Sequence, residues 1–162
     1  MVTPYNALIL PHLSYNILAW GNTCKTYLNN LLYMQKRVVR NIHNAHFTAH
    51  TLPLFINANI LPASELYKYQ LGIFMFKFHN GLLPSSFNTF FTYNNALYSY
   101  NTRSRGNFHV PRSRTKVSQS QTRTCGATLW NSLPSEITSK RTIHTFKSSL
   151  KKYLFNLLAI DL

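Results

Sequence analysis

The sequence predicts a mainly α-helical chain, in which a small helical bundle is followed by a basic, irregular connector and a C-terminal helix. Apolar residues recur at intervals of three and four over much of 1–91 and again over 125–162. Between these regions, residues 92–124 are rich in Tyr, Asn, Ser, Thr and Arg and show little apolar periodicity. Hydrophobic residues make up 45% of the 162, which is enough for a core.

The most regular pattern predicts a helix from Thr26 to His43. Its buried stripe has helical spacing and consists of Leu28, Leu31, Leu32, Gln35, Val38, Val39 and Ile42. Upstream, residues 5–20 also have helical spacing, and Pro11 is expected to kink or divide this segment. Downstream, residues 51–62 predict a loop with a short turn of helix.

A second long helix is predicted from an N-cap at Ser64 to about His79, where Asn80 and Gly81 end it. It is apolar nearly all round, so we expect it to be buried. The phenylalanines in and after it are interpreted as core rather than as platforms for bases: Phe74, Phe76, Phe78, Phe87, Phe90 and Phe91. Further on, a strand is considered at 107–111, a short helix is predicted within 125–134, and Thr142 is expected to cap the last helix.

Composition divides the chain into a helical segment at 1–45, a helical extension at 46–91, an Arg-rich connector at 92–124 and a helical segment at 125–162. Charge is uneven along this series. Residues 1–100 hold six basic residues and one acid (net +5), and residues 101–162 hold eleven basic residues and two acids (net +9).

The whole chain has 17 Lys and Arg against three acids, a formal net charge of +14. Such a chain attracts polyanions. We favour nucleic acid over an anionic membrane surface, because no predicted helix carries the long cationic face of a surface binder. Two isolated cysteines indicate a reducing setting, so we expect an intracellular protein, nuclear or cytoplasmic. The first residues match neither a signal peptide nor a transmembrane segment.

The shortage of carboxylates argues against catalysis by this chain on its own. The acids Glu65, Glu136 and Asp161 are 71 and 25 positions apart, whereas metal-dependent phosphoryl transfer needs clustered carboxylates. There is no G-x-S-x-G nucleophile motif, and the five glycines are scattered singly. The sequence therefore predicts a non-catalytic chain and indicates no cofactor.

Two sets of cations are candidates for nucleic-acid binding. The first, here called the basic ridge, lies mostly outside the apolar stripe of the 26–43 helix and consists of Lys36, Arg37 and Arg40. The second, here called the connector cations, consists of Arg103, Arg105, Arg112, Arg114 and Lys116. It contains no acid and is flanked by Tyr98, Tyr100 and Phe108, which could stack on unpaired bases. The alternative is an ordinary solvated loop, although such surfaces usually mix both signs of charge.

A metal site was considered at His43, His46 and His50, with Cys24 as a fourth ligand, because imidazole suits zinc. The helix is expected to end before these histidines share a face, and no carboxylate is near to orient them. We favour polar histidines near a helix C-terminus, and predict no metal.

Several stretches occur in a recognisable order. They are LILPHLSYNILAWGNT (8–23), LNNLLYMQKRVVRNI (28–42), HTLPLF (50–55), IL (60–61), LGIFMFKFHNGLLPSSFNTFF (71–91), TRSRGNFHVPRSRT (102–115), GATLWNSLPSEI (126–137) and TFKSSLKKYL (145–154). Together they resemble the region that follows the catalytic palm in reverse transcriptases of LINE-type (non-LTR) retrotransposons. No single stretch is diagnostic, but the ordered set is fairly specific.

This resemblance implies a helical thumb at about 1–45, which in the family packs against the template–primer duplex, followed by a basic C-terminal extension that handles RNA template or target DNA. It implies that the fingers and palm, with their aromatic-Ala-Asp-Asp signature, are missing from this chain and are its partners. The chain departs from the family at Asn16, where glycine is expected.

Two other interpretations stay open. One is a stand-alone basic RNA-binding protein, either ribosome-associated or organellar, and the other is a decayed reading frame without function. Genomic context separates them. Coding sequence for an Ala-Asp-Asp palm directly upstream supports the reverse transcriptase interpretation, whereas a promoter and an intact gene structure there count against it.

Overall fold

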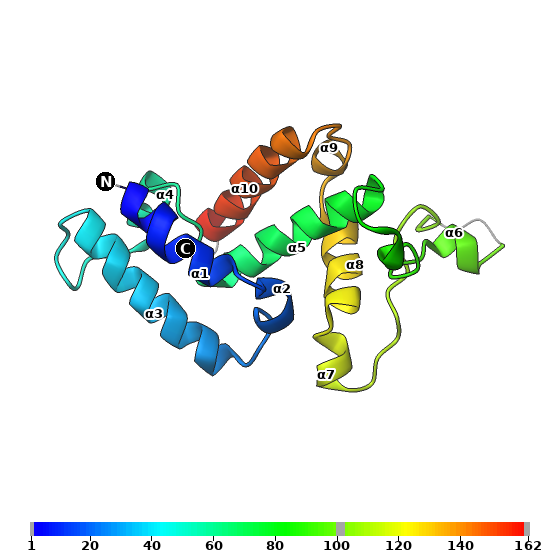
Figure 1. Cartoon of the computed structure of the whole chain (residues 1–162), viewed down its shortest axis with the longest axis horizontal. Coiled ribbons are helices and arrows are strands. Elements are labelled where there is room, and N and C mark those ends of the chain that lie inside the picture. The colour runs from blue at the N-terminus through cyan, green and yellow to red at the C-terminus, as the bar shows by residue number, and fades with distance from the viewer. Residues whose placement is uncertain (1, 100–102, 161–162) are drawn as a thin grey trace. The chain divides into compact units, whose positions relative to one another are not determined.

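The computed structural model describes residues 2–99 and 103–160, and these residues are mainly helical (Figure 1). The elements are η1 (Tyr5–Ile9), α1 (Leu10–Ser14), α2 (Ile17–Trp20), α3 (Lys25–Ile42), α4 (Leu52–Asn57), α5 (Ala63–His79), η2 (Ser85–Phe87), α6 (Asn94–Leu97), α7 (Lys116–Gln119), α8 (Thr122–Ser132), α9 (Ser135–Thr138) and α10 (Ile143–Ile160). The mainly α fold class is confirmed. Tyr100 and Asp161 lie outside the described residues.

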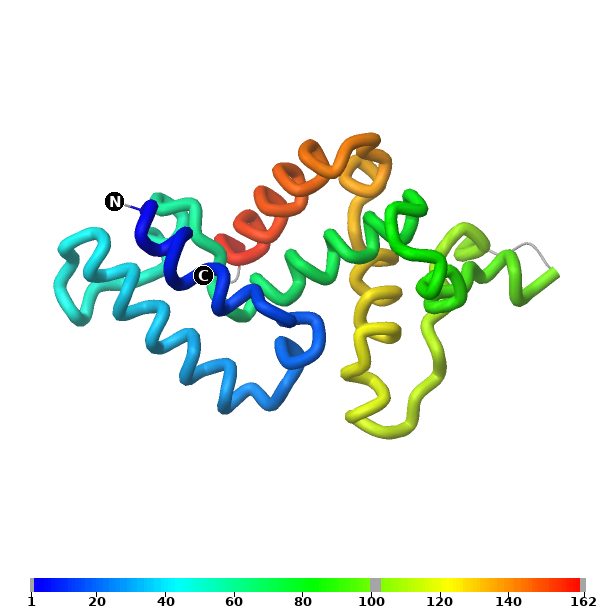
Figure 2. The backbone as a smooth tube through the Cα atoms, in the orientation of Figure 1, coloured from blue at the N-terminus to red at the C-terminus, as the bar shows by residue number. Residues whose placement is uncertain are grey.

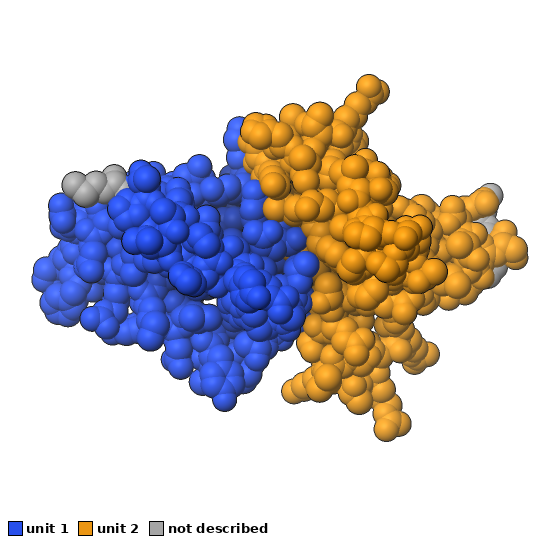
Figure 3. All heavy atoms as spheres, viewed as in Figure 1, with its two compact units in different colours: residues 1–70, 151–162 blue, residues 71–150 orange. Residues whose placement is uncertain are grey.

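The chain divides into two compact units, each described by itself (Figure 3). Unit 1 comprises residues 1–70 and 151–162, and unit 2 comprises residues 71–150. The boundaries fall inside α5 and at Lys151 in α10. The four segments predicted from composition follow the order of the chain, whereas the units group residues that contact one another. The four-segment division therefore stays a prediction.

The N-terminal helices of unit 1 break at Asn16 rather than at Pro11 (Figure 2). Pro11 is the second residue of α1, which follows the π-helical turn η1 without a break, so the helix changes type just before the proline rather than ending there. The chain instead leaves the helical conformation at Tyr15, and Asn16 follows with a φ of 48°. Asparagine tolerates this left-handed backbone better than most residues other than glycine. Next to Pro11 the helix therefore changes from π to α, and the division of the segment lies at Tyr15 and Asn16.

Helix α3 is the centre of unit 1 and confirms the most regular sequence pattern. Val39 is fully buried and packs in a core with Tyr5, Phe55, Ala58 and Ile60. The other apolar members of the predicted stripe, from Leu28 to Ile42, are half-buried rather than buried. The stripe therefore faces inward as its period predicts.

Gln35 is the polar member of that stripe and is only 2% exposed. Its Nε2 donates to Tyr5 Oη at 2.6 Å and to the Leu61 carbonyl at 2.9 Å, and its Oε1 accepts from the Ala63 N–H at 2.8 Å. One side chain thus joins three separate segments. Burial raises the pKa of the Tyr5 hydroxyl, and the hydrogen bond from Gln35 opposes that rise.

The predicted N-cap of α5 at Ser64 is wrong. Ser64 is an exposed residue inside the helix, which begins at Ala63. The Ala63 N–H bonds to Gln35, and the N–H groups of Glu65 and Leu66 each bond to the Pro62 carbonyl at 2.9 Å. A side chain from α3 therefore supplies the partner that sequence analysis assigned to a local serine. The burial predicted for this helix is confirmed.

Unit 2 has an aromatic core between the second part of α5, helix α8 and the first part of α10. Phe76 stacks on Phe146 with ring centroids 4.5 Å apart, and Trp130 lies 5.8 Å from Phe146. All six phenylalanines predicted to be core are buried or half-buried, and each contacts another aromatic ring. Their interpretation as core residues is confirmed.

Helix α8 passes close to α5 at Gly126 (Figure 1). A Cβ on Gly126 would lie 2.8 Å from Met75 Sδ and 3.1 Å from Phe91 Cζ, so the close approach requires glycine. Helix α8 begins at Thr122, earlier than predicted. The predicted cap of α10 is confirmed, because the Thr145 N–H donates to Thr142 Oγ1 at 3.3 Å.

The connector is more ordered than its composition predicts. It contains the short helices α6 and α7, and in place of the strand considered at 107–111 it forms an isolated antiparallel bridge between Tyr93 and Phe108. No β-strand forms within residues 2–99 and 103–160. The bridge ends there because Pro111 lacks the N–H that a longer ladder would need.

Candidate nucleic-acid interface

The basic ridge lies on α3, a helix that contains no acidic residue. Arg37 is exposed, whereas Lys36 and Arg40 are half-buried. The Arg40 Nε donates to the Ala49 carbonyl at 3.0 Å, so this side chain also holds the segment after the helix. Arg37 and Arg40 line one pocket, and Lys36 is not among its lining residues. Two of the three predicted ridge residues therefore share a pocket.

The histidines considered for a metal are separated from Cys24 by the whole of α3. Cys24 precedes the helix and His43 follows it, and 18 helical residues between them span about 27 Å. His46 instead bonds through Nδ1 to Thr48 Oγ1 at 2.7 Å. Within the described ranges, no three His, Cys, Asp or Glu side chains are grouped to hold a metal ion.

All five connector cations are exposed, and they lie in unit 2. The loop that carries Arg103 and Arg105 is fixed by helix α6. The Asn94 side chain donates to the Ser104 carbonyl at 2.9 Å, the Asn94 N–H bonds to the Asn107 carbonyl at 3.0 Å, and the Asn95 N–H bonds to the Arg105 carbonyl at 3.1 Å. These bonds use the loop's carbonyl groups and leave both guanidinium groups at the surface.

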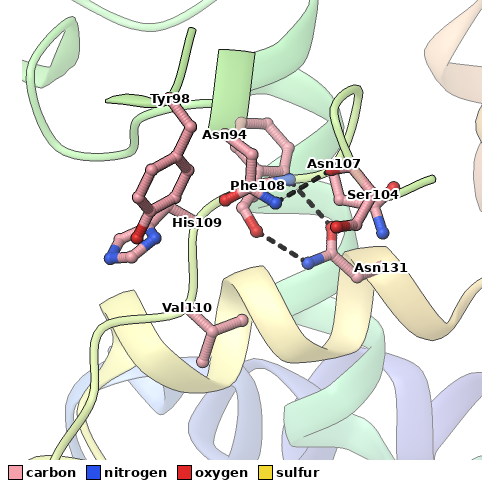
Figure 4. Close-up of a pocket in the computed structure, with 8 residues that line it drawn as sticks. All are labelled: Asn94, Tyr98, Ser104, Asn107, Phe108, His109, Val110 and Asn131. Atoms are coloured by element: carbon pink, nitrogen blue, oxygen red, sulfur yellow. Dashed lines mark hydrogen bonds between the residues drawn. The ribbon is translucent and has the colours of Figure 1, made fainter. Parts of the chain in front are cut away.

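Helix α8 fixes the next residues of the connector through Asn131 (Figure 4). Its Nδ2 donates to the Phe108 carbonyl at 2.8 Å, and its Oδ1 accepts from the Phe108 N–H at 3.0 Å. These two hydrogen bonds satisfy the N–H and the carbonyl of Phe108 as a neighbouring strand would, and they are here called the Asn131 clamp. Beside it lies a pocket of about 370 Å³, whose lining includes Tyr98, His109 and Val110 (Figure 4).

The last three connector cations precede or begin α7. Thr115 caps this helix by accepting from the Ser118 N–H at 3.2 Å, and Gln119 Nε2 donates to the Ser113 carbonyl at 3.1 Å. These bonds order the backbone between Arg112 and Lys116. The alternation of exposed Arg112 and Arg114 with half-buried Pro111 and Ser113 keeps the charges outward.

Few carboxylates oppose these cations. Unit 2 contains ten basic residues and one acid, Glu136, which is exposed in α9. In unit 1, Glu65 is buried and forms an ion pair with Lys68 at 3.0 Å. No acid lies within α3 or within the connector, so each of these two segments has a net positive charge that attracts anions.

Sequence analysis did not identify the asparagines that order the connector or the aromatic residues near the basic ridge. The side chains of Asn94 and Asn131 bond to backbone groups of the connector, and Asn95 bonds through its own backbone N–H, so none of the three gives a periodic signal in the sequence. Tyr33 and Phe47 line the pocket that contains Arg37 and Arg40. An apolar Phe47 in a histidine-containing loop was the only available hint.

The Asn131 clamp makes a testable contribution to stability. We expect Asn131→Ala to lower the free energy of unfolding by about 2–4 kcal/mol, because it leaves a backbone donor and acceptor without their partner. Asn131→Asp keeps the acceptor for the Phe108 N–H and loses the donor to the Phe108 carbonyl. Its free energy of unfolding should therefore lie between those of the alanine variant and the parent. Urea unfolding followed by tryptophan fluorescence measures both, with Trp130 next to the clamp. An alanine variant as stable as the parent contradicts this role.

No protein-family model, curated protein or solved structure matches the chain. Among the described residues, no helix has the length and apolar character that crossing a bilayer requires.

Proposed function

We propose that this chain binds nucleic acid, as an RNA–DNA hybrid, RNA or DNA, through the connector cations and the basic ridge, without catalysing a reaction itself. The observation that carries the proposal is the connector. Its five cations are exposed on a backbone fixed by side-chain and backbone hydrogen bonds, in a unit with ten basic residues and one acid. Cations held in fixed positions lose less conformational entropy when they bind phosphates.

We further propose that the chain is the thumb and C-terminal segment of a LINE-type reverse transcriptase, with the palm and fingers as its partners. Support comes from the ordered set of motifs and from Asn16. The family pattern has glycine at that position, and Asn16 has the left-handed backbone that favours glycine, with a φ of 48°. The residue type thus departs from the family, but the backbone conformation at Asn16 is one that glycine adopts readily.

The non-catalytic part of the proposal is supported by the acids themselves. The buried Glu65 is paired with the exposed Lys68, and Glu136 is an exposed residue in the first turn of α9, where a negative charge is favourable. Each has a local structural role. Within residues 2–99 and 103–160, neither belongs to a group of side chains that could hold a metal ion.

Affinity for a blunt RNA–DNA hybrid, measured over a range of salt concentrations, tests the proposal. If the five connector cations each contact a phosphate, log K should fall with log salt with a slope of about −4.5, since each contact contributes about 0.9. Vesicles of anionic phospholipid serve as the comparison, because a membrane binder would prefer them. A flat salt response, or tighter binding to vesicles than to the hybrid, contradicts the proposal.

A further inference from the structure

A pocket at the C-terminal end of α3 combines aromatic rings with cations. It has a volume of about 460 Å³, within the range of sites for small molecules, and is lined by Tyr33, Arg37, Arg40, Asn41, Ala45 and Phe47. Sequence analysis assigned phosphate contacts to the two arginines but gave no role to the aromatic residues beside them.

The chain reverses direction directly after α3 (Figure 2). Asn44 has a φ of 50°, the Ala45 N–H bonds to the Arg40 carbonyl at 3.0 Å, and the Asn44 N–H bonds to the Asn41 carbonyl at 3.2 Å. This is the Schellman arrangement, with asparagine in the left-handed position. It directs Phe47 back toward the residues of α3 that line the pocket.

Two further hydrogen bonds fix the loop beyond that turn. The Arg40 Nε donates to the Ala49 carbonyl at 3.0 Å, and His46 Nδ1 bonds to Thr48 Oγ1 at 2.7 Å. Phe47 is therefore part of an ordered loop rather than a free chain. Its ring contacts that of His46, with centroids 4.5 Å apart.

Both aromatic residues of the pocket are largely exposed, so packing in the core does not account for their position. Phe47 is 76% exposed and Tyr33 is 62% exposed. Exposed aromatic rings beside arginines, on an ordered backbone, match the chemistry of single-stranded nucleic-acid sites, where bases stack on rings and guanidinium groups bind the backbone. No acid of α3 or of residues 43–50 would repel a phosphate there.

We propose that this pocket binds an unpaired nucleobase, which stacks on Phe47 or Tyr33 while Arg37 binds the adjacent phosphate. The proposal rests on the proposed function and adds to it a preference for single-stranded nucleic acid next to a duplex. It also assigns Arg40 a positioning role, because its Nε is already bonded to Ala49.

Three ligands test this inference on the full chain: a blunt RNA–DNA hybrid, the same hybrid with a short oligothymidylate overhang, and the same hybrid with an abasic overhang of equal length. The two overhangs carry equal charge and differ only in bases. At matched salt, we expect the overhang with bases to bind about 5- to 150-fold more tightly than the abasic one, the range that one or more base–aromatic stacks provide.

The double variant Phe47→Ala/Tyr33→Ala should remove that preference, and the high exposure of both side chains means that the fold should tolerate it. Tyr27→Ala is the control, because Tyr27 is 67% exposed on α3 but does not line the pocket, and this variant should keep the preference. Equal binding of both overhangs, with a steep salt response, overturns the pocket and leaves the proposed function standing. Absence of binding to all three ligands overturns the proposed function as well.

Discussion

Replacing the five connector cations with glutamine should weaken binding to an RNA–DNA hybrid by up to about 3 × 10⁴-fold at 0.1 M salt. Each phosphate contact contributes about 0.9 to the slope of log K against log salt, and at 0.1 M this corresponds to about 0.9 log units of affinity. Five contacts therefore contribute about 4.5 log units. The slope itself should become shallower by about 4.5, which separates lost phosphate contacts from a general loss of folding.

A control variant with the same net charge makes this experiment specific. Both variants reduce the formal charge from +14 to +9, since 14 − 5 = 9. The control replaces five exposed cations outside the two proposed surfaces, namely Lys25, Lys140, Arg141, Lys147 and Lys152. If binding depends only on overall charge, both variants lose affinity equally. If the connector is the interface, the control keeps most of the slope, and an unchanged slope in the connector variant sinks the assignment.

The parts of the fold that sequence predicted well are those determined by local or periodic patterns. Helix α3 begins and ends one residue before the predicted bounds, and Thr142 caps α10 because a threonine can reach the N–H three residues ahead. The phenylalanines of 74–91 are core residues, as their density in an apolar helix and the segment after it predicts.

The parts that sequence did not predict depend on hydrogen bonds between residues far apart in the chain. Gln35 caps α5 from 28 positions away, and the Asn131 clamp spans 23 positions. Neither bond leaves a periodic trace, so Ser64 was assigned as the cap and 107–111 was considered as a strand. The candidate site likewise has features that local composition predicts and features that depend on long-range contacts. Composition locates the connector cations, but the asparagines that order them and the exposed ring of Phe47 follow only from the tertiary structure.

Gln35→Leu should destabilise the chain by about 3–6 kcal/mol, as much as the whole stability of many small domains. The substitution removes three hydrogen bonds and leaves Tyr5 Oη, the Leu61 carbonyl and the Ala63 N–H without that partner in the interior. Each such buried group costs about 1–3 kcal/mol, and the apolar gain of leucine offsets part of this. Urea unfolding followed by circular dichroism measures the loss, and a change below about 1 kcal/mol would show that these bonds contribute little.

Gln35→Glu tests the same hydrogen bonds through pH. A glutamate oxygen can still accept from the Ala63 N–H, but only the protonated carboxyl can donate to the Leu61 carbonyl. Burial at this position raises the pKa of the carboxyl above its unfolded value of about 4.3. The stability of this variant relative to the parent should therefore be greatest below that value and fall as pH rises through the folded-state pKa. Gln35→Leu has no group to titrate at this position, so its deficit should stay constant with pH, and a parallel pH profile for the two variants would contradict the donor role of Gln35.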